Sequence, residues 1–404
     1  MIVTVCGQGY VGLSVAIAAA QVGHDVIGYD NNEYVILNLL EGKTKVPGVS
    51  SDQIKSLMKS GKYKPTTNFH DTLGSDILIL AVPTPLNDKR DPDLSYLIQL
   101  LELIAVTFKG KALVINESTS YPGTLRNIIL PILSSSKTAE FKYASAPERV
   151  DPGNLNWDVQ NTPRVVAGID EESSELAANF YESFCFNVSK VSNPEVAEAA
   201  KIFENTFRQV NIALVNEFSE ICQKLGISAY DAINAASTKP FGFMPFYPGI
   251  GVGGHCIPVD PSYLSYIARK NGIAANFIEL ANKINNAAPR KIALRIRDSF
   301  SGSLQGKRIQ IAGISYKPGI SDMREAPSIK LISELRVLGA QVFWFDPLVV
   351  TFENETSVPL DPTVDLGLIV TPHSIIDFSI WLTAKTKVFD LSASSEFLGW
   401  PKFL

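Results

Sequence analysis

The chain has 404 residues, of which 46% are hydrophobic, and this is enough for two or three domains that each bury a core. A formal net charge of -5 argues against nucleic acid or an anionic membrane surface as the main partner. The four cysteines form no CxxC pair and the four histidines are scattered, so neither a disulfide framework nor a metal site is expected. No apolar run is long enough to cross a bilayer and the first residues resemble a strand, which predicts a cytoplasmic protein.

The start of the chain predicts a strand, a glycine turn and a helix. A β-branched run over residues 1–6 is followed by Gly7, Gly9 and Gly12, and then by alanine-rich helical sequence to Val22. In a dinucleotide fingerprint, these glycines permit the tight turn, the close approach of a pyrophosphate and the close packing of the helix. The N–H groups at the helix start, from Tyr10 and Val11 onward, attract phosphate. The alternative is a tight turn that holds no ligand.

A second predicted strand, over residues 24–30, ends in Asp30. An acidic residue at this spacing accepts hydrogen bonds from the ribose of the cofactor and repels a 2′-phosphate. The sequence therefore predicts NAD as the cofactor, in preference to NADP.

Three further predicted strands end in polar residues. They cover residues 76–83, 111–117 and 142–147, and the alternation with helical sequence predicts a doubly wound α/β sheet. Ligands bind such sheets at the carboxyl ends of the strands. The alternative is that these polar residues only form turns. The residues at the three ends are Thr84 and Pro85, Ser118 and Thr119, and Glu148 and Arg149.

The longest helical pattern runs from about Glu195 to Leu225, without Gly or Pro. Lys201, Asn205 and Arg208 lie four and three residues apart and therefore share one face. A lysine and an asparagine there would stabilise a developing oxyanion, or else they are solvated side chains on a structural helix. The pattern is apolar on more than one face, which predicts a homodimer built on this helix.

Residues 251–260 form a glycine-rich run that contains Cys256 and ends in Asp260. A thiol with little side-chain bulk around it can attack a carbonyl carbon, and Asp260 can orient a water or a proton. A thiol nucleophile together with a redox cofactor suggests the oxidation of an alcohol beyond the aldehyde to an acid. The alternative is a buried cysteine in a glycine-rich loop.

The C-terminal part predicts a second, smaller α/β unit. Strands are expected over residues 306–313 and 340–346, with a helix over residues 326–338 between them. The loop before that helix carries Lys317 and Arg324 in place of a glycine fingerprint, which favours a nucleotide clamp made by side chains. Domain boundaries are predicted near residues 190 and 300.

The motifs GQGYVG, VPTP, EST, APERVDPG, KIFENTF, GVGGHCIPVDP and SYKPGISDMRE occur in the order seen in the UDP-glucose/GDP-mannose dehydrogenase family, and this resemblance covers almost the whole chain. It implies an N-terminal Rossmann-type domain (1–190), a central helical domain (191–300) and a C-terminal Rossmann-like domain for the UDP-sugar (301–404). The motifs most resemble the branch that acts on UDP-N-acetylhexosamines, especially UDP-N-acetylglucosamine, in polysaccharide biosynthesis. UDP-N-acetylmannosamine, UDP-N-acetylgalactosamine and UDP-glucose are the alternatives.

The resemblance implies a four-electron oxidation of the sugar C6 alcohol to a uronate, with two NAD consumed per turnover. Cys256 would form a thiohemiacetal and then a thioester, Lys201 and Asn205 would stabilise oxyanions, Thr119 and Asp260 would hold a water, and Glu148 would support hydrolysis. Beyond these catalytic residues, the implied cofactor contacts are Gly7, Gly9, Tyr10, Val11, Gly12, Asp30, Pro83, Thr84, Ser118 and Arg324. The implied substrate contacts are Glu148, Arg149, Val150, Lys201, Asn205, Arg208, Tyr247, Gly249, Gly251, Gly253 and Lys317.

The chain departs from the family pattern at two places. Val35 stands where many members carry Lys or Arg near the adenosine, and the run Phe389–Ser392 lacks the substrate-binding arginine that members often show. Two other classes of function remain open: a two-electron dehydrogenase of 3-hydroxy acids, which would not need Cys256, and a non-catalytic NAD-binding module.

Overall fold

The computed structural model describes residues 1–151, 153–154, 156–394, 396 and 398–404, so position 152 of the APERVDPG motif lies outside the described residues. The chain forms two compact units. Unit 1 contains residues 1–204 and 262–273, and unit 2 contains residues 205–261 and 274–404. The boundaries predicted near residues 190 and 300 divide the chain at other points and stay a prediction.

Unit 1 is built on an eight-stranded sheet with the order β3-β2-β1-β4-β5-β6-β7-β8. Neighbouring strands are parallel except for the antiparallel pair β6–β7. β4 is apolar and buried at all four positions, as is typical of a strand covered on both faces. The strands are β1 Ile2–Cys6, β2 Asp25–Tyr29, β3 Tyr63–Thr66, β4 Ile77–Leu80, β5 Gly110–Asn116, β6 Ala139–Ser145, β7 Arg164–Gly168 and β8 Val188–Lys190.

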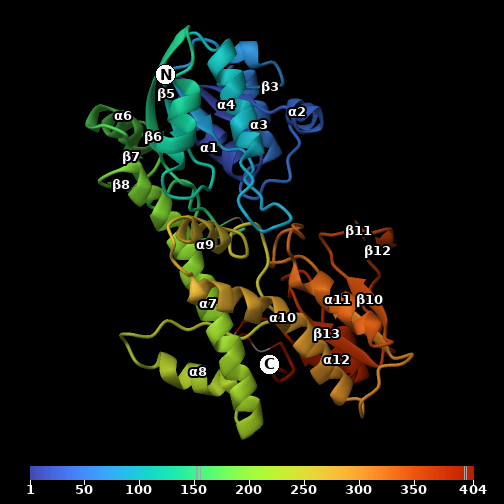
Figure 1. Ribbon diagram of the computed structural model, residues 1–404. Helices are drawn as coiled ribbons and strands as arrows, with labels where there is room; N and C mark the ends of the chain where they lie inside the picture. Colours follow the sequence, from blue (N-terminus) through green and yellow to red (C-terminus); the bar gives the residue numbers. More distant parts are fainter. Residues whose placement is uncertain (152, 155, 395, 397) are drawn as a thin grey trace. The chain divides into compact units, whose positions relative to one another are not determined.

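Helices cover both faces of this sheet (Figure 1). Ile77 and Ile79 of β4 pack in one core with α1, α3 and α6, whereas Leu78 and Leu80 pack in a second core with α4. This alternation along the strand defines a doubly wound sheet. The helices of unit 1 outside the long helix are α1 Tyr10–Gln21, α2 Glu33–Leu40, α3 Ser51–Lys59, η1 Phe69–Thr72, α4 Ser95–Thr107, η2 Leu125–Ile129, α5 Leu130–Leu133, α6 Glu171–Glu182 and α9 Asp260–Lys270, which belongs to this unit from Ser262 onward.

The long predicted helix is α7, Pro194–Leu225, and it is one continuous helix of 32 residues. Lys201 belongs to the part of α7 in unit 1, and Asn205 begins the part in unit 2. No helix in the described part of the chain has the length and apolarity needed to cross a membrane.

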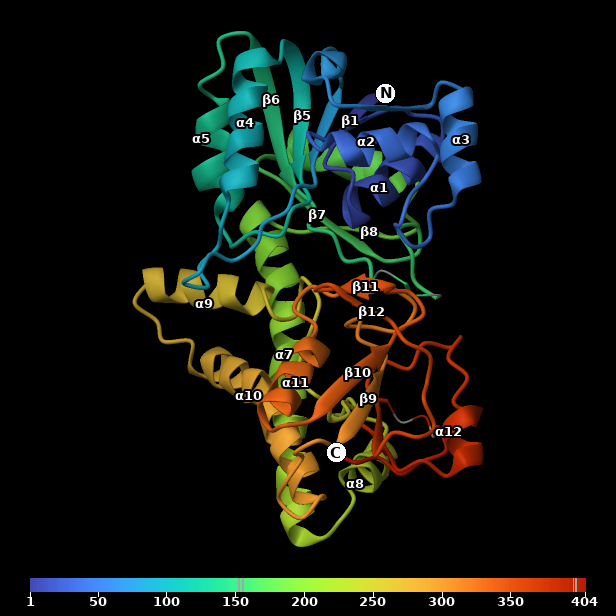
Figure 2. The ribbon, with the colours of Figure 1, turned by 90° about the vertical axis from the view of Figure 1, so that its right-hand side faces the viewer.

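Unit 2 carries a four-stranded parallel sheet with the order β10-β9-β13-β14. Figure 2 shows β9 and β10 of this sheet side by side. Trp344 packs on one side of it and Trp381 on the other. The strands are β9 Arg308–Ala312, β10 Gln341–Phe345, β13 Leu366–Ile369 and β14 Val388–Asp390, with a small antiparallel pair β11 Thr351–Phe352 and β12 Glu355–Thr356. The helices of unit 2, apart from α7, are α8 Ala229–Ser237, α10 Asn276–Asp298, α11 Pro327–Val337 and α12 Ser379–Ala384. The predicted fold is confirmed: a Rossmann-type domain, a long helix and a Rossmann-like C-terminal domain.

Candidate active site

The glycine turn after β1 has the geometry of a dinucleotide cradle. Gly7 has φ +96°, and a Cβ added to it would lie 2.4 Å from the carbonyl oxygen of Ala81. A Cβ on Gly12 would lie 1.8 Å from the Gly7 oxygen, so both positions need glycine for close packing. A Cβ on Gly9, the N-cap of α1, would meet no described atom within 4 Å. The cradle therefore leaves open space where a pyrophosphate would approach the backbone.

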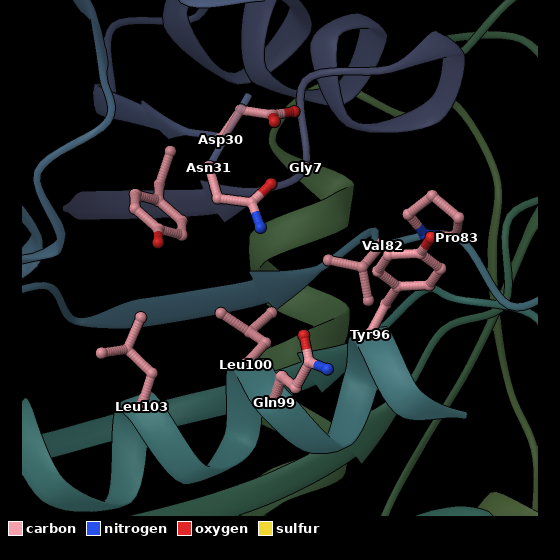
Figure 3. Close-up of a pocket in the computed structure, with 10 residues that line it drawn as sticks. Gly7, Asp30, Asn31, Val82, Pro83, Tyr96, Gln99, Leu100 and Leu103 are labelled. Carbon is pink, nitrogen blue, oxygen red and sulfur yellow. The ribbon is translucent and has the colours of Figure 1, made fainter. Parts of the chain in front are cut away.

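Asp30 lines a cavity of about 170 Å³ at the carboxyl edge of the sheet (Figure 3). One carboxylate oxygen accepts a hydrogen bond from the Gln8 N–H at 2.8 Å, and the other accepts from the Asn32 N–H at 2.9 Å. Each carboxylate oxygen can accept a second bond, so this group fits a ribose hydroxyl. The cavity is lined by Gly7, Tyr29, Asp30, Asn31, Val82, Pro83, Tyr96, Gln99, Leu100 and Leu103.

Two features of this cavity were missed in the sequence. Tyr96, Gln99 and Leu103 come from α4, and nothing in an ordinary helical pattern distinguishes them as lining residues. Gln8, between Gly7 and Gly9, was not predicted to have a role, yet its buried side chain accepts a hydrogen bond from the Tyr63 hydroxyl at 2.7 Å. The Gln8 side chain thereby fixes the turn whose N–H holds Asp30.

The predicted residues at the strand ends lie in different surroundings. Ser118 is buried, and its hydroxyl donates to the Val82 carbonyl at 2.9 Å, whereas Thr119 is half-buried. Thr84 is buried and its carbonyl accepts from the Tyr263 hydroxyl at 2.7 Å. Glu148 and Val150 line a small cavity of about 30 Å³ together with Tyr10 and Val11, which brings predicted substrate and cofactor residues together.

Two loops of unit 1, after β5 and after β6, bind side chains of α7 on either side of Lys201. The Glu198 carboxylate accepts hydrogen bonds from the N–H groups of Gly123 (2.7 Å) and Leu125 (2.9 Å), in the loop that follows Thr119. Arg149, after β6, forms an ion pair with Glu204 at 2.7 Å. Lys201 is itself 9% exposed. The predicted lysine thus lies on the turn of α7 to which the loops after β5 and β6 are bound.

Burial raises the pKa of Glu198 to about 7, although the hydrogen bonds from Leu125 and Gly123 act in the opposite direction. The carboxylate that anchors the loop after β5 therefore titrates near neutral pH.

In unit 2, the structure brings Asn205, Asp260 and the loop of Cys256 together. The Asn205 amide donates to the Asp260 carboxylate at 2.6 Å, and the Asp260 N–H donates to the Cys256 carbonyl at 2.8 Å. Both Asn205 and Asp260 are buried, and the Cys256 side chain is exposed. Arg208, one turn further along α7, is exposed. The alternative of a buried Cys256 is therefore wrong.

The glycines before Cys256 have a packing role that was not predicted. A Cβ on Gly253 would lie 2.8 Å from both Tyr316 and Pro327, and a Cβ on Gly254 would lie 2.7 Å from the Tyr316 ring. The Gly254 N–H also donates to the Arg324 carbonyl at 2.9 Å. These glycines let the cysteine loop pack against the loop that carries Lys317, in addition to any effect on the space around the sulfur.

Lys317 and Tyr247, which were predicted to contact the substrate, and Arg324, which was predicted to contact the cofactor, belong to the same unit. Lys317 is half-buried, and the Arg324 guanidinium bonds to Asp322, with Nη2 2.5 Å from Oδ2. The Tyr247 ring stacks on Tyr230, and its hydroxyl donates to Asn234 at 2.9 Å.

Close packing also explains two more predicted glycines. A Cβ on Gly249 would lie 2.9 Å from the Ala393 side chain, and Gly251, with φ +120°, approaches the Asn285 carbonyl. The run Phe389–Ser392, which lacks the arginine of other members, is contacted by a lysine from the end of the chain. Lys402 Nζ lies 2.8 Å from both the Asp390 carboxylate and the Ser392 hydroxyl.

A buried polar cluster beneath the ends of β5 and β6 was not predicted. Glu117, directly before Ser118, lies 3.5 Å from the Arg164 guanidinium and accepts a hydrogen bond from the Tyr181 hydroxyl. Arg164 also donates to the Ala146 carbonyl at 3.3 Å. Burial acts to lower the pKa of Arg164, but the attraction to Glu117 outweighs it and the pKa is raised. An arginine directly before the apolar residues of β7 was the available signal for such a buried pair.

Comparison with known proteins matches three consecutive parts of the chain to one family. Residues 1–185 match the NAD binding domain of the UDP-glucose/GDP-mannose dehydrogenase family, residues 195–287 match its central domain, and residues 310–388 match its UDP binding domain. These ranges contain both the glycine cradle and the cysteine loop.

Individual relatives cover most of the chain. The UDP-N-acetyl-D-mannosamine dehydrogenase of Pyrococcus horikoshii is 35% identical over 86% of this chain and 84% of its own. The UDP-N-acetyl-D-glucosamine 6-dehydrogenase of Pseudomonas aeruginosa is 33% identical over 86% of this chain and 83% of its own. The solved structure of the Pyrococcus horikoshii UDP-D-ManNAc dehydrogenase superposes with a TM-score of 0.87 at 31% identity, covering 100% of this chain and 97% of that chain. The chain therefore belongs to the UDP-glucose/GDP-mannose dehydrogenase family, as an oxidoreductase that uses NAD.

Proposed function

We propose that the protein oxidises the C6 alcohol of a UDP-N-acetylhexosamine to the uronate, through a covalent intermediate on Cys256. The observation that carries the proposal is the hydrogen bond from Asn205 to Asp260, whose own N–H is bonded to the carbonyl of the exposed Cys256. Lys201 lies one turn before Asn205 on the same face of α7, so an ammonium and an amide are available to one oxyanion.

Each of these residues has a defined task in the proposed reaction. Asp260, through a bound water, accepts the proton of the C6 hydroxyl, while Lys201 and Asn205 stabilise the developing alkoxide. The Cys256 sulfur then attacks the aldehyde carbon, and the resulting thiohemiacetal is oxidised to a thioester. Water cleaves the thioester with support from Glu148, and this step releases the uronate and restores the thiol.

The glycine cradle and Asp30 would hold the cofactor through its pyrophosphate and its ribose. When bound there, NAD accepts the hydride in each of the two oxidation steps. A covalent sulfur adduct keeps the aldehyde from escaping between those steps. A two-electron dehydrogenase or a non-catalytic NAD-binding module would have no use for the arrangement of Cys256, Asp260 and Asn205.

The choice of sugar rests on the relatives and on the motifs. The motifs favour UDP-N-acetylglucosamine, whereas the relatives with 35% and 33% identity act, by their names, on UDP-N-acetyl-D-mannosamine and UDP-N-acetyl-D-glucosamine. Both of these substrates are UDP-N-acetylhexosamines, and the proposal is made for that class. Within the class, the motifs predict UDP-N-acetylglucosamine as the substrate.

The test is the initial rate of NADH formation with UDP-N-acetylglucosamine, UDP-N-acetylmannosamine, UDP-N-acetylgalactosamine and UDP-glucose. We expect kcat/KM for a UDP-N-acetylhexosamine to exceed that for UDP-glucose by about 10-fold or more, because a site built for the acetamido group loses contacts when it is absent. A preference for UDP-glucose would refute the hexosamine proposal. The absence of NADH with all four sugars would refute the dehydrogenase reaction itself.

A further inference from the structure

A buried polar cluster lies at the carboxyl ends of β9, β10 and β13 in unit 2. It consists of Ser315, Asp346 and His373, which are all 2% exposed or less. The His373 Nε2 lies 3.1 Å from the Asp346 carboxylate and 3.0 Å from the Ser315 hydroxyl. The functional residues proposed above do not include any member of this cluster.

The cluster occupies the place that the cofactor cavity has in unit 1. The Gly7 N–H donates to the Tyr29 carbonyl at 2.8 Å, and the Gly313 N–H donates to the Phe345 carbonyl at 2.7 Å. Asp346 follows β10 as Asp30 follows β2, and each carboxylate accepts from the N–H of the residue after its glycine, Ile314 or Gln8. The two units therefore share the turn and the acidic residue of a nucleotide-binding sheet.

The two acidic residues nevertheless have different surroundings. Asp30 lines a cavity, whereas the Asp346 carboxylate accepts hydrogen bonds from four backbone N–H groups in addition to His373. Burial acts to raise the pKa of Asp346, but the hydrogen bonds from His373 and the backbone outweigh it and leave the pKa below its ordinary value. Asp346 is therefore an internal acceptor rather than a ribose ligand. The four donors are Ile314, Ser315, Leu348 and Val349.

The hydrogen bonds of His373 define its tautomer. The Gly319 N–H donates to Nδ1 at 3.0 Å, so Nδ1 carries no proton and the proton lies on Nε2. The Nε2–H is then directed at Asp346 and Ser315, and the Ser315 hydroxyl donates onward to the Lys317 carbonyl at 3.1 Å. One imidazole thus holds the loop on both sides of Lys317.

We propose that His373 is a positioning residue for the nucleotide end of the substrate: as the neutral Nε2–H tautomer, it fixes the loop from Ile314 to Gly319 in the shape that presents Lys317. This inference rests on the proposed function, because Lys317 matters only if the protein binds a UDP-sugar. Its expected signature is a change in substrate affinity without a change in the chemical steps, since His373 touches neither Cys256 nor Asp260 through any of the contacts described.

Three substitutions separate the two sides of the imidazole. In His373→Asn the amide oxygen can replace Nδ1 as acceptor from Gly319, whereas in His373→Gln the amide nitrogen can replace Nε2 as donor to Asp346. His373→Ala removes both contacts. We expect His373→Ala to raise the KM for the UDP-sugar by about 10-fold or more, with kcat and the KM for NAD changed by less than about 2-fold. His373→Asn is expected to restore more of the affinity than His373→Gln, because Gly319 lies on the loop itself.

A fall in kcat at constant KM, or an unchanged KM in His373→Ala, would overturn the inference. If the variants do not fold, the imidazole ¹⁵N signals of the wild-type protein with bound UDP still test it at pH 7. A protonated Nε2 with a bare Nδ1 supports the proposal, and a protonated Nδ1 contradicts it. A wild-type protein that oxidises no UDP-sugar and binds no UDP would refute the proposed function instead, so the two failures are distinguishable.

Discussion

Cys256 is the residue on which the proposed chemistry depends most directly. Its side chain is exposed in a loop held by Gly254 and Asp260, so a change of its sulfur to oxygen leaves the packing of the loop intact. We expect Cys256→Ser to lower steady-state NADH production by about 10³-fold or more, because an ester on serine hydrolyses more slowly than a thioester. The measurement is a stopped-flow trace of NADH. Turnover near the wild-type rate would exclude covalent catalysis by Cys256.

Asp30 is the residue expected to select NAD. Its carboxylate lines the cavity of Figure 3 and would repel a 2′-phosphate. We expect wild type to use NAD better than NADP by about 100-fold or more in kcat/KM, and Asp30→Ala to narrow that ratio by about 10-fold. Asp25→Ala is a matched control, because Asp25 begins the same strand and forms an exposed ion pair with Lys62. Equal kcat/KM values for the two cofactors in wild type would contradict the role of Asp30.

For single residues, the sequence predicted which glycines matter better than it predicted the physical reason for each. The fingerprint spacing identified Gly7 and Gly12, where the packing requires glycine, whereas the roles of Gly9 and Asp30 toward the cofactor stay predictions. The reason for Gly253 and Gly254 was incomplete, since Tyr316, which packs on them, is more than 60 residues away in the chain. Contacts of this kind leave no periodic or local pattern, and so no single sequence reveals them.

Among the elements, α7 joins most of the proposed machinery. Glu198, Glu204 and Asn205 lie within about two turns of this helix. Glu198 binds the loop after β5, Glu204 binds Arg149 after β6, and Asn205 binds Asp260 at the start of α9. The helical pattern predicted this element and its boundaries closely, because a periodic run of this length without Gly or Pro fits few structures other than a helix. The roles of Glu198 and Glu204 were not predicted, because two glutamates on a long helix are ordinarily solvent-exposed.

Glu198 predicts a pH dependence of stability in unit 1. Its pKa in the folded protein, about 7, is above the ordinary value, so the folded state binds the proton more tightly than the unfolded state. The stabilisation by that proton is complete below pH ~4.5 and is lost as the pH rises through 7, with a total of roughly 3 kcal/mol. We expect Glu198→Gln to flatten the fall in unfolding free energy between pH ~5 and pH ~7, as measured by chemical denaturation.

Glu140→Gln is the control for this prediction. Hydrogen bonding to Lys111 at the surface lowers the pKa of Glu140, so its contribution is present at neutral pH and is lost only as the pH falls below the ordinary range. Its removal should leave the slope between pH ~5 and pH ~7 unchanged. If the unfolding free energies of wild type and Glu198→Gln fall in parallel between pH ~5 and pH ~7, the Glu198 carboxyl titrates outside this range.

At the scale of the whole molecule, α7 carries apolar side chains that the single chain leaves exposed. They recur at intervals that place them along one side of the helix, which is typical of a surface covered by a second helix. The exposed fractions are 65% for Phe203, 42% for Phe207, 59% for Leu214, 50% for Ile221 and 67% for Leu225. The homodimer remains a prediction, and this stripe is the surface that we expect to form it.

The dimer prediction is tested by the mass in solution. We expect wild type to scatter light as a dimer at micromolar concentration, and Leu214→Glu/Ile221→Glu to scatter as a monomer, because burying two carboxylates in an apolar interface costs several kcal/mol. Gln223→Glu is the control, since it adds a charge at an exposed polar position of the same helix. A monomeric wild type with full activity would refute the prediction.

The stoichiometry of the reaction tests the central claim most directly. A four-electron oxidation through Cys256 consumes two NAD for each UDP-sugar, whereas an enzyme that stops at the aldehyde consumes one. The measurement is the total NADH formed from a limiting, known amount of the preferred UDP-N-acetylhexosamine with excess NAD, together with the mass of the sugar product. The account predicts two NADH per sugar and a UDP-uronate as the product. One NADH per sugar, with an aldehyde as the product, would contradict it.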